Sequence, residues 1–383
     1  MEENKTVSEY SEDLLQENTA AAGVMRILDA SADRACEALR VIEDYVRFIL
    51  DDAHLSGLLK NLRHRLTAET ARFPHAARMA FRDTAADVGT AISTDAEFRR
   101  ADFSHVLAAN FSRLQEALRS LEEFSKISFP QSAQVFETLR YESYTLQKAV
   151  HFTASGASAE TEDSLRAKLA AAKLYVLTDG AENETAFSRR VDALLTGGAD
   201  VIQLRDKNAD DAQLLARAKI IRRLITEQNA ETIFIVNDRP DIAILSGAHG
   251  VHVGQEEFSV RDVRILCGPE KLVGVSTHSL SQARNAVLAG ADYLGVGPTF
   301  PSATKSFADF PGLTLLLQVS SEIRLPAFAI GGITLENLPH VLKTGFTRVA
   351  VSSAITSLHE PEAIIAAVKE FQAVLGDKTE PQS

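Results

Sequence analysis

The segment DVIQLRDKNADDAQLLARAKIIRRLITEQNAETIFIVND, residues 200–238, decides the fold class of this chain. It begins and ends with nearly continuous apolar runs, at 200–206 and 233–238, and an amphipathic stretch of helical length separates them. Strands that are covered on both faces have to be apolar throughout. The segment therefore predicts two parallel strands joined by a helical crossover.

The same alternation continues through residues 171–375. Eight apolar runs with crossover segments, in about 200 residues, predict an α/β fold of the (β/α)8, or TIM-barrel, type. A doubly wound open sheet is the alternative, but it needs a glycine-rich turn after an early strand, and LTDGAENE at 177–184 is not one. The eight runs are LYVLTD (174–179), DVIQLRD (200–206), IFIVND (233–238), GVHVG (250–254), LVGVST (272–277), YLGVG (293–297), FAIGG (328–332) and RVAVSS (348–353).

Residues 24–150 carry a helical pattern instead, and an all-α domain is expected there. On a helix over 35–50, the apolar residues form one stripe opposite a face rich in Arg and Glu. That stripe consists of Ala35, Leu39, Ile42, Val46 and Ile49. The polar residues 1–23 are expected to be disordered. The small and polar residues of 151–170 are expected to form the linker to the barrel.

The composition of the 383-residue chain excludes several classes of protein. A net charge of −12 argues against a nucleic-acid partner, which normally selects a basic surface, and no apolar run is long enough to cross a membrane. The two cysteines, Cys36 and Cys267, fall in different predicted domains and suit a reducing compartment. With no apolar stretch near the amino terminus, a cytoplasmic protein is expected. The sequence leaves open whether the chain forms a homo-oligomer.

Polar residues gather where the predicted strands end, which is where barrels of this type carry their active sites. Alternation sends Gln203, Arg205 and Lys207 to one side of the second strand, a pattern suited to gripping a polyanion. The third strand ends at Asn237-Asp238, and the fourth runs into an acidic stretch that includes Glu257. Oxygen-bearing ends on neighbouring strands are what Mg2+ uses, so Mg2+ is the expected cofactor.

The remaining strand ends add groups that suit phosphate binding. Ser276 closes the fifth strand, and the loop after the sixth holds two hydroxyls and an ammonium, on Ser302, Thr304 and Lys305. Gly331-Gly332 and Ser352-Ser353 follow the seventh and eighth strands, where barrels often bind a phosphate. Each of these motifs alone is explained as well by a structural role as by a functional one, but the strand ends taken together, in their order along the chain, favour a functional role.

No strong general base is needed, so His249, His252 and His278 are interpreted as packing or surface residues, with His278 beside Ser276 kept open as an active-site group. Asp206 and Asp241 are interpreted as local hydrogen-bond partners.

About residues 170 to 375 resemble thiamine-phosphate synthase over their whole length. The motifs that carry the resemblance are QLRDK, VNDRPDIA, GVHVGQEE, GVSTHS, GADYLGVGPTFPSATKS, AIGGI and RVAVSSAI. The resemblance implies joining of 4-amino-2-methyl-5-hydroxymethylpyrimidine diphosphate to 4-methyl-5-(2-hydroxyethyl)thiazole phosphate, with release of pyrophosphate.

The resemblance also implies residue roles. Gln203, Arg205 and Lys207 would hold the pyrimidine diphosphate, with Asn237 and Ser276 against the same substrate, and Asp238 and Glu257 would bind Mg2+. The family usually has Asp where this chain has Glu257. The groups that would hold phosphates are Ser302, Thr304 and Lys305 for the diphosphate, and Gly332, Ser352 and Ser353 for the thiazole phosphate. Arg205, Lys207 and Lys305 would act in catalysis.

The helical region repeats itself. Residues 34–47 align with 113–126 at a constant offset, and the shared residues lie mainly on the polar face. We interpret this as a duplicated helical hairpin. A solvated face of Arg/Glu pairs explains the pattern, and so does a site for a phosphorylated ligand.

About residues 24 to 150 resemble a small helical domain that is often fused to thiamine-phosphate synthase and is assigned as a hydroxymethylpyrimidine-phosphate kinase. The carrying motifs are RILDASADRACEALRVIEDYVRF, NLRHRL, RDTAADVG and NFSRLQEALRSLEEF. The resemblance implies a bifunctional enzyme with ATP as the co-substrate of this domain. The candidate residues are Asp29, Arg34, Glu37, Arg40, Glu43, Arg63, His64, Arg82, Asp87, Asn110, Arg113, Glu116, Arg119 and Glu122.

Two alternatives stay open. The barrel resembles a thiazole tautomerase as well, a paralogue without the pyrophosphate grip, although the intact QLRDK and PSATK segments count against it. The helical domain is alternatively a non-catalytic dimerisation or docking module on a working synthase.

Overall fold

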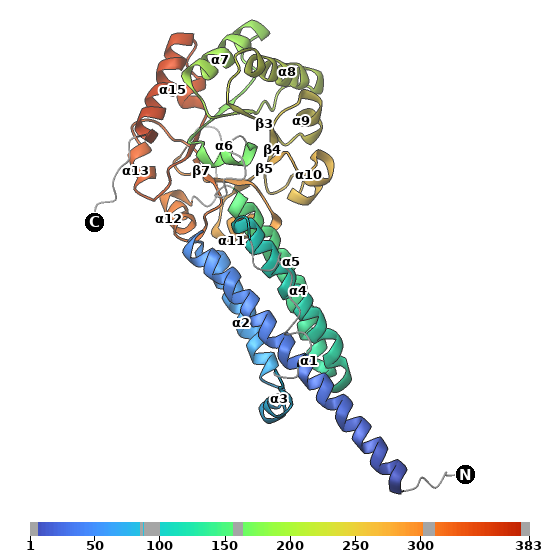
Figure 1. Ribbon diagram of the computed structural model, residues 1–383. Helices are drawn as coiled ribbons and strands as arrows, with labels where there is room; N and C mark the ends of the chain where they lie inside the picture. Colours follow the sequence, from blue (N-terminus) through green and yellow to red (C-terminus); the bar gives the residue numbers. More distant parts are fainter. Residues whose placement is uncertain (1–6, 85–86, 88–99, 156–163, 302–310, 377–383) are drawn as a thin grey trace. The chain divides into compact units, whose positions relative to one another are not determined.

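The computed structural model describes residues 7–84, 87, 100–155, 164–301 and 311–376. The chain divides into two compact units (Figure 1). The first is formed by Met1–Asp51 and Leu55–Val150, and the second by Asp52–His54 and His151–Ser383. The described part of the first unit is helical, and the second contains a closed barrel, as the sequence predicts.

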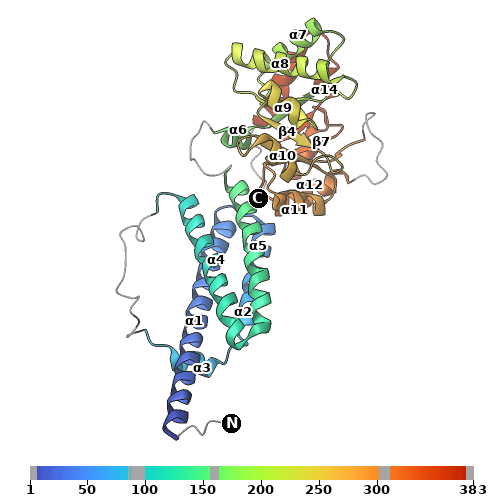
Figure 2. The same ribbon diagram turned by 90° about the vertical axis from the view of Figure 1, so that its right-hand side faces the viewer.

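The first unit is a bundle whose long helices run alongside one another (Figure 2). Its core is apolar, with Leu39, Leu118 and Phe136 each no more than 1% exposed. The side chain of Asp102 accepts a hydrogen bond from the backbone N–H of His105 at 2.8 Å and so caps the fourth helix. The helices are α1 (Val7–Phe48), α2 (Ala53–Thr70), α3 (His75–Phe81), α4 (Phe103–Ser128) and α5 (Pro130–Ser155).

The periodicity of the first helix locates most of its buried face. Ala35, Leu39, Ile42 and Val46 are buried as expected, but Ile49 is 53% exposed because α1 ends at Phe48 and the helical period ends with it. Glu43, expected on the polar face, is only 6% exposed. α1 begins at Val7, inside the segment expected to be disordered, and this stretch contains no proline to interrupt a helix.

The second unit is built around eight parallel strands that close into a barrel in sequence order, from β1 next to β2 round to β8 next to β1. The closure rules out the open doubly wound sheet. Each strand falls within or beside one of the apolar runs. The strands are β1 (Leu174–Thr178), β2 (Val201–Leu204), β3 (Ile233–Asn237), β4 (Gly250–Val253), β5 (Leu272–Thr277), β6 (Tyr293–Val296), β7 (Ala327–Ile330) and β8 (Val349–Val351).

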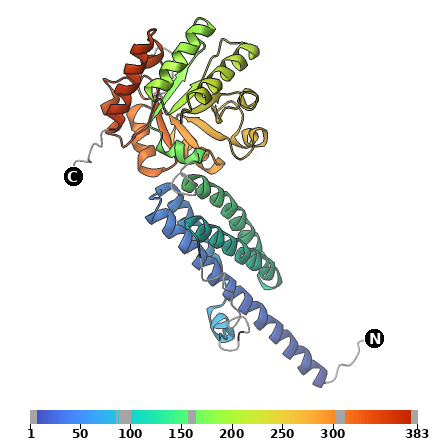
Figure 3. The ribbon, with the colours of Figure 1, turned by 45° about the horizontal axis from the view of Figure 1, so that its top comes forward.

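Helices surround the strands (Figure 3). Their ends carry the residues that stop and start helices: Asp210 and Gln213 form a capping box on α8, and α7 ends at Gly198 in the left-handed conformation. The expected linker, 151–170, includes the end of α5 and most of α6. The helices are α6 (Leu165–Ala171), α7 (Glu184–Gly197), α8 (Asp211–Glu227), α9 (Pro240–Ser246), α10 (Val260–Cys267), α11 (Leu280–Ala289), α12 (Gly312–Glu322), α13 (Leu338–Leu342), α14 (Ser353–Thr356) and α15 (Pro361–Gly376).

The interior of the barrel is packed with side chains. Ile235, Tyr175, Tyr293 and Phe328 belong to one buried cluster there. The rings of Tyr175 and Phe328 lie 5.2 Å apart, centroid to centroid, and those of Tyr293 and Phe328 lie 5.8 Å apart. A packed interior leaves the carboxyl ends of the strands as the place for ligands.

Candidate active site

The second strand presents one buried and two more accessible polar groups. Gln203 is 2% exposed, and its Nε2 donates a hydrogen bond to the hydroxyl of Tyr175 at 2.8 Å. Its other amide atom, Oε1, is buried and finds no partner in the part of the chain that the structure describes. Arg205 is half-buried and Lys207 is exposed. A buried carbonyl oxygen without a donor marks a position where a ligand can supply one.

The two predicted metal ligands lie close to each other and to these cations. Burial raises the pKa of Asp238, and the negative charge of Glu257 raises it further, while the charges of Lys207 and Arg205 lower it. Three charged groups, two that follow β2 and one that follows β4, therefore act on the carboxylate that follows β3. These interactions place four charged side chains in one region of the barrel mouth, those of Arg205, Lys207, Asp238 and Glu257.

Asp238 is held in an unusual backbone conformation. Its φ is +59°, in the left-handed region that Asp adopts more readily than most residues. Its N–H donates to the carbonyl of His252 at 2.8 Å, and Asn237 Nδ2 donates to its Oδ2 at 2.5 Å.

The arrangement fits a magnesium ion that keeps several water ligands. Carboxylates are the protein ligands that Mg2+ favours, and one or two of them suffice when substrate phosphates complete the octahedron. Among the described residues, no group of three or more His, Cys, Asp or Glu side chains is arranged to hold a metal ion. The longer Glu257 reaches back over the strand end, since a Cβ on Gly254 would lie 2.2 Å from its Oε2.

Ser276 near the end of β5 contacts His252, a residue that was interpreted from the sequence as packing. Its Oγ lies 2.9 Å from Nε2 of His252, while His278 Nδ1 lies 2.6 Å from the carbonyl of Gly297. Gln255 Nε2 also donates to the backbone oxygen of Ser276 at 2.5 Å. The alternation of side chains along β4 turns His252 toward the barrel interior. This alternation is visible in the sequence, but it was interpreted only as a sign of packing.

The strand ends after β6 and β7 pack tightly against each other. Thr299 is buried and donates through its backbone N–H and its hydroxyl to the carbonyl of Ile330, at 2.9 and 3.0 Å. Gly331 and Gly332 have φ values of +104° and +63°, and a Cβ on Gly332 would lie 2.8 Å from the carbonyl oxygen of Pro301. Only glycine suits both conditions. The predicted phosphate groups of Ser302, Thr304 and Lys305 lie outside the described residues.

Ser352 and Ser353, after β8, are both exposed. The hydroxyl of Ser352 donates to the carbonyl of Leu177 at 3.2 Å, and Ser353 opens the four-residue helix α14. Their backbone is thus placed at the same end of the barrel as Gly332.

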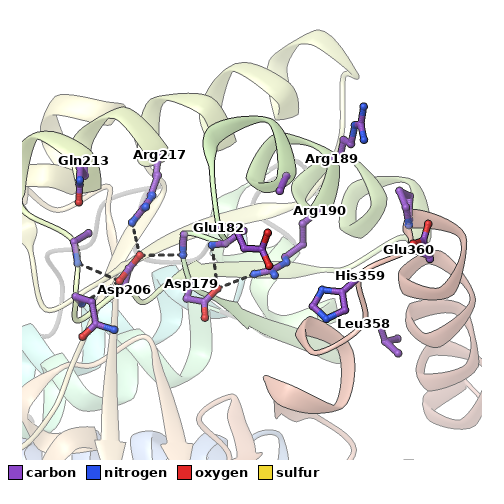
Figure 4. Close-up of a pocket in the computed structure, with 16 residues that line it drawn as sticks. Asp179, Glu182, Arg189, Arg190, Asp206, Gln213, Arg217, Leu358, His359 and Glu360 are labelled. Atoms are coloured by element: carbon purple, nitrogen blue, oxygen red, sulfur yellow. Dashed lines mark hydrogen bonds and ion pairs between the residues drawn. The ribbon is translucent and has the colours of Figure 1, made fainter.

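A cavity of about 700 Å³ lies beside this region (Figure 4). The segments after β1 and β2 and the segment between α14 and α15 line it, and no predicted site residue is among its lining. Arg190 pairs with Asp179 at 2.7 Å, and Arg217 pairs with Asp206. Asp206 also accepts hydrogen bonds from backbone N–H groups, including that of Gly180 at 2.9 Å, as expected for a local partner. Asp241 is likewise held by Arg239.

In the helical unit the duplicated residues form duplicated ion pairs. Arg63 Nε donates to the buried carboxylate of Glu43 at 2.8 Å, and in the second repeat Arg140 Nε donates to the buried carboxylate of Glu122 at 2.9 Å. Each pair joins the two helices of one hairpin. These contacts favour a structural role for the two glutamates.

The other candidates of the helical unit include side chains that form ion pairs or hydrogen bonds and side chains that are exposed, and some are both. Buried Asp29 accepts hydrogen bonds from Arg78 and Arg82, both at 2.6 Å. Arg40 lies 3.8 Å from Glu43, and Arg119 lies 2.6 Å from Glu122. Asn110 donates to the carbonyl of Val106 at 2.8 Å, and Ser112 donates to Glu116 at 2.7 Å. Further exposed candidates are Arg34, Glu37, His64, Asp87 and Arg113.

Comparison with known proteins finds a matching family model for each of the two regions of the chain. A family model described as thiamine monophosphate synthase matches residues 174–355, and the ThiD2 family model matches residues 26–149. A thiamine-phosphate synthase of Rhodopirellula baltica is 44% identical over 343 residues, covering 88% of this chain and 90% of that protein. The chain belongs to the thiamine-phosphate synthase family. Another member, from Synechococcus sp. CC9311, is 40% identical over 351 residues, covering 91% of this chain and 96% of that protein.

A solved structure of a thiamine phosphate pyrophosphorylase from Pyrococcus furiosus is 36% identical, with a TM-score of 0.48, and covers 56% of this chain and 98% of that one. As a member of the thiamine-phosphate synthase family, the chain is a transferase of thiamine biosynthesis. No helix in the described ranges is long and apolar enough to cross a membrane.

Proposed function

We propose that the barrel joins 4-amino-2-methyl-5-hydroxymethylpyrimidine diphosphate to 4-methyl-5-(2-hydroxyethyl)thiazole phosphate, giving thiamine phosphate and pyrophosphate. The observation that carries this proposal is that the charges of Arg205, Lys207 and Glu257 all act on the carboxylate of Asp238 at one end of the barrel. Two cations and two carboxylates in one region suit a diphosphate bound with a divalent metal ion.

The chemistry needs charge stabilisation more than it needs a base. An aminopyrimidine delocalises positive charge onto its ring when the bond to the diphosphate breaks, so the leaving group can depart before the thiazole nitrogen attacks. Mg2+ held by Asp238 and Glu257 would neutralise part of the charge on the leaving diphosphate. Arg205 and Lys207, together with Lys305, would stabilise the remaining negative charge.

The other predicted roles complete the site. Gln203 and Ser276, with Asn237 beside them, would contact the pyrimidine. Ser302 and Thr304 would bind the diphosphate oxygens. The backbone at Gly332, Ser352 and Ser353 would hold the thiazole phosphate, where close backbone approach to an anion is available.

Arg205→Gln tests the role of the barrel mouth. The full chain is incubated with both substrates and Mg2+, and thiamine phosphate and pyrophosphate are quantified by chromatography. We expect a loss of at least about a hundredfold in kcat/KM, in the range found when a group that stabilises transition-state charge is removed. Arg223→Gln is the matched control, because Arg223 is 58% exposed on α8 and only forms a surface ion pair with Glu227. Equal activity of the two variants would contradict the assignment.

We further propose that the helical unit phosphorylates the pyrimidine monophosphate with ATP, producing the substrate of the barrel. The match of residues 26–149 to the ThiD2 family supports this. The test uses the full chain carrying Arg205→Gln, supplied with ATP, Mg2+ and the pyrimidine monophosphate. Accumulation of ADP and pyrimidine diphosphate supports the kinase, and their absence, beside a working synthase in the unmodified chain, favours the docking module.

A further inference from the structure

A chain of hydrogen bonds crosses the barrel interior and joins two of the side chains proposed to contact the pyrimidine, Gln203 and Ser276. Gln203 Nε2 lies 2.8 Å from the hydroxyl of Tyr175, which lies 3.1 Å from the hydroxyl of Tyr293. The latter lies 3.2 Å from Nδ1 of His252, whose Nε2 lies 2.9 Å from Oγ of Ser276. Five strands contribute one residue each.

The surrounding strands are shaped to admit these rings. A Cβ on Gly274 of β5 would lie 2.1 Å from Cζ of Tyr293, and a Cβ on Gly295 of β6 would lie 3.1 Å from Cε1 of His252. Tyr175, Tyr293 and His252 are 2%, 1% and 8% exposed. Buried polar groups of this kind are costly unless each finds a partner, so the chain is a specific feature of this interior.

The direction of the hydrogen bonds is fixed by the groups in the chain. The ring of His252 is buried and its two nitrogens face the hydroxyls of Tyr293 and Ser276, a setting that favours the neutral ring with one donor and one acceptor nitrogen. Burial raises the pKa of both tyrosines, which therefore keep their protons. Since Gln203 Nε2 can only donate, Tyr175 donates to Tyr293 and Tyr293 donates to Nδ1 of His252. Nε2 of His252 then carries the proton and donates to Ser276.

The two ends of the chain are thereby set to opposite polarity. Gln203 is left with its carbonyl oxygen as a free acceptor, and this is the buried Oε1 that finds no partner among the described residues. Ser276, which accepts from His252, is left with its hydroxyl proton to donate. A ligand that fits both ends offers a donor to Gln203 and an acceptor to Ser276.

We propose that Tyr175, Tyr293 and His252 are positioning residues that fix this polarity and so select a 4-amino over a 4-oxo pyrimidine. This rests on the proposed synthase function. An exocyclic amino group donates to Oε1 of Gln203, whereas a 4-oxo group places an acceptor against an acceptor. A site built to hydrogen-bond one such group rejects the analogue that lacks it, because its buried polar atom is left unpaired.

The first measurement reads the histidine directly and needs no activity. Selective 15N-histidine labelling of the full chain, with His252 assigned by its absence in His252→Gln, gives the tautomer from the nitrogen shifts and the one-bond N–H coupling. We expect a proton on Nε2 and none on Nδ1. A proton on Nδ1 reverses the chain and overturns the proposal.

The second measurement compares the pyrimidine diphosphate with its 4-oxo analogue as substrates. In Tyr175→Phe and Tyr293→Phe, the ratio of kcat/KM for the two should narrow by about tenfold, the worth of one hydrogen bond to a buried group, while KM for the thiazole phosphate stays unchanged. Thr277→Val is the control, because its buried hydroxyl donates to the carbonyl of Gly295 at 3.2 Å, outside the chain.

The outcomes separate the two proposals. An unchanged ratio in both tyrosine variants, with product still formed, overturns the positioning role and leaves the synthase standing. If the unmodified chain forms no product from the 4-amino substrate, the synthase proposal falls and with it the selection of the 4-amino group.

Discussion

Replacing Arg63 by alanine tests whether the Arg/Glu signature of the helical unit is structural. Arg63 of α2 donates to Glu43 of α1, and the Glu43 side chain is 7% exposed. Removing the guanidinium leaves a buried carboxylate without its strong partner. Breaking such a pair typically costs 3–5 kcal/mol, and because the Arg63 side chain is 17% exposed we expect about 3 kcal/mol, near the low end of that range.

Arg65→Ala is the matched control, two residues along the same helix. Arg65 pairs with Glu142 at 2.6 Å, but the two side chains are 41% and 42% exposed. A solvent-exposed pair of this kind is worth about 0.5 kcal/mol. The two variants thus remove the same group from neighbouring positions and differ mainly in the burial of the partner.

Amide hydrogen exchange read by mass spectrometry resolves the helical unit from the barrel. For peptides of α1 and α2, Arg63→Ala should raise exchange through global opening by about a hundredfold, since 1.4 kcal/mol corresponds to a factor of ten. Arg65→Ala should change it by less than about threefold. If both variants exchange like the unmodified chain while Arg63→Ala loses phosphorylation, the structural interpretation is refuted and Arg63 belongs to a kinase site.

Three further predictions concern the barrel and its surroundings. Burial lowers the pKa of His249 and His252 from 6.5 to about 4. Between pH 6.5 and pH 4 the unfolded chain therefore takes up protons that the folded chain does not, and Tm should fall as the pH drops through this range. The fall in Tm should be less steep in His249→Gln. Gly331→Ala should lower Tm markedly, because φ is +104° and the new Cβ would lie 2.9 Å from Cα of Pro298, whereas Gly57→Ala, with nothing within 4 Å in α2, should stabilise its helix by about 0.5–1 kcal/mol. EDTA should abolish synthesis and Mg2+ should restore it. Lys305→Ala should lower turnover strongly with Tm unchanged, because the ammonium is proposed to stabilise the leaving diphosphate rather than the fold. Near-normal turnover would remove Lys305 from the mechanism.

The barrel was predictable because its strands are covered on both faces and must be apolar throughout. That constraint acts within each run, so β1 to β8 each fall on a predicted run, with ends that differ by a few residues at most. The polar groups that follow the strands were visible in the sequence for a related reason, since Asp238 and Glu257 come after the apolar pattern of β3 and β4 has ended.

What escaped prediction depends on pairs that are distant in sequence. Glu43 falls on the polar face of its helix by periodicity, and nothing within α1 shows that Arg63 neutralises it there. His252 was interpreted as packing because its role depends on Tyr293 and Ser276 in other strands. A pattern within one segment carries no information on which neighbour completes a hydrogen bond.

The glycines beneath Tyr293 and His252 have a consequence for laboratory evolution of this enzyme. Barrel enzymes usually change substrate through their rim while the interior is left alone. Here Gln203 is hydrogen-bonded to the buried hydroxyl of Tyr175, and Ser276 is hydrogen-bonded to the buried ring of His252. The rings of Tyr293 and His252 occupy the space that Gly274 and Gly295 leave open. A library of variants for new pyrimidine substrates should therefore change Gln203 or Ser276 together with the interior positions. A single change at either residue would leave a buried polar group without its hydrogen-bond partner.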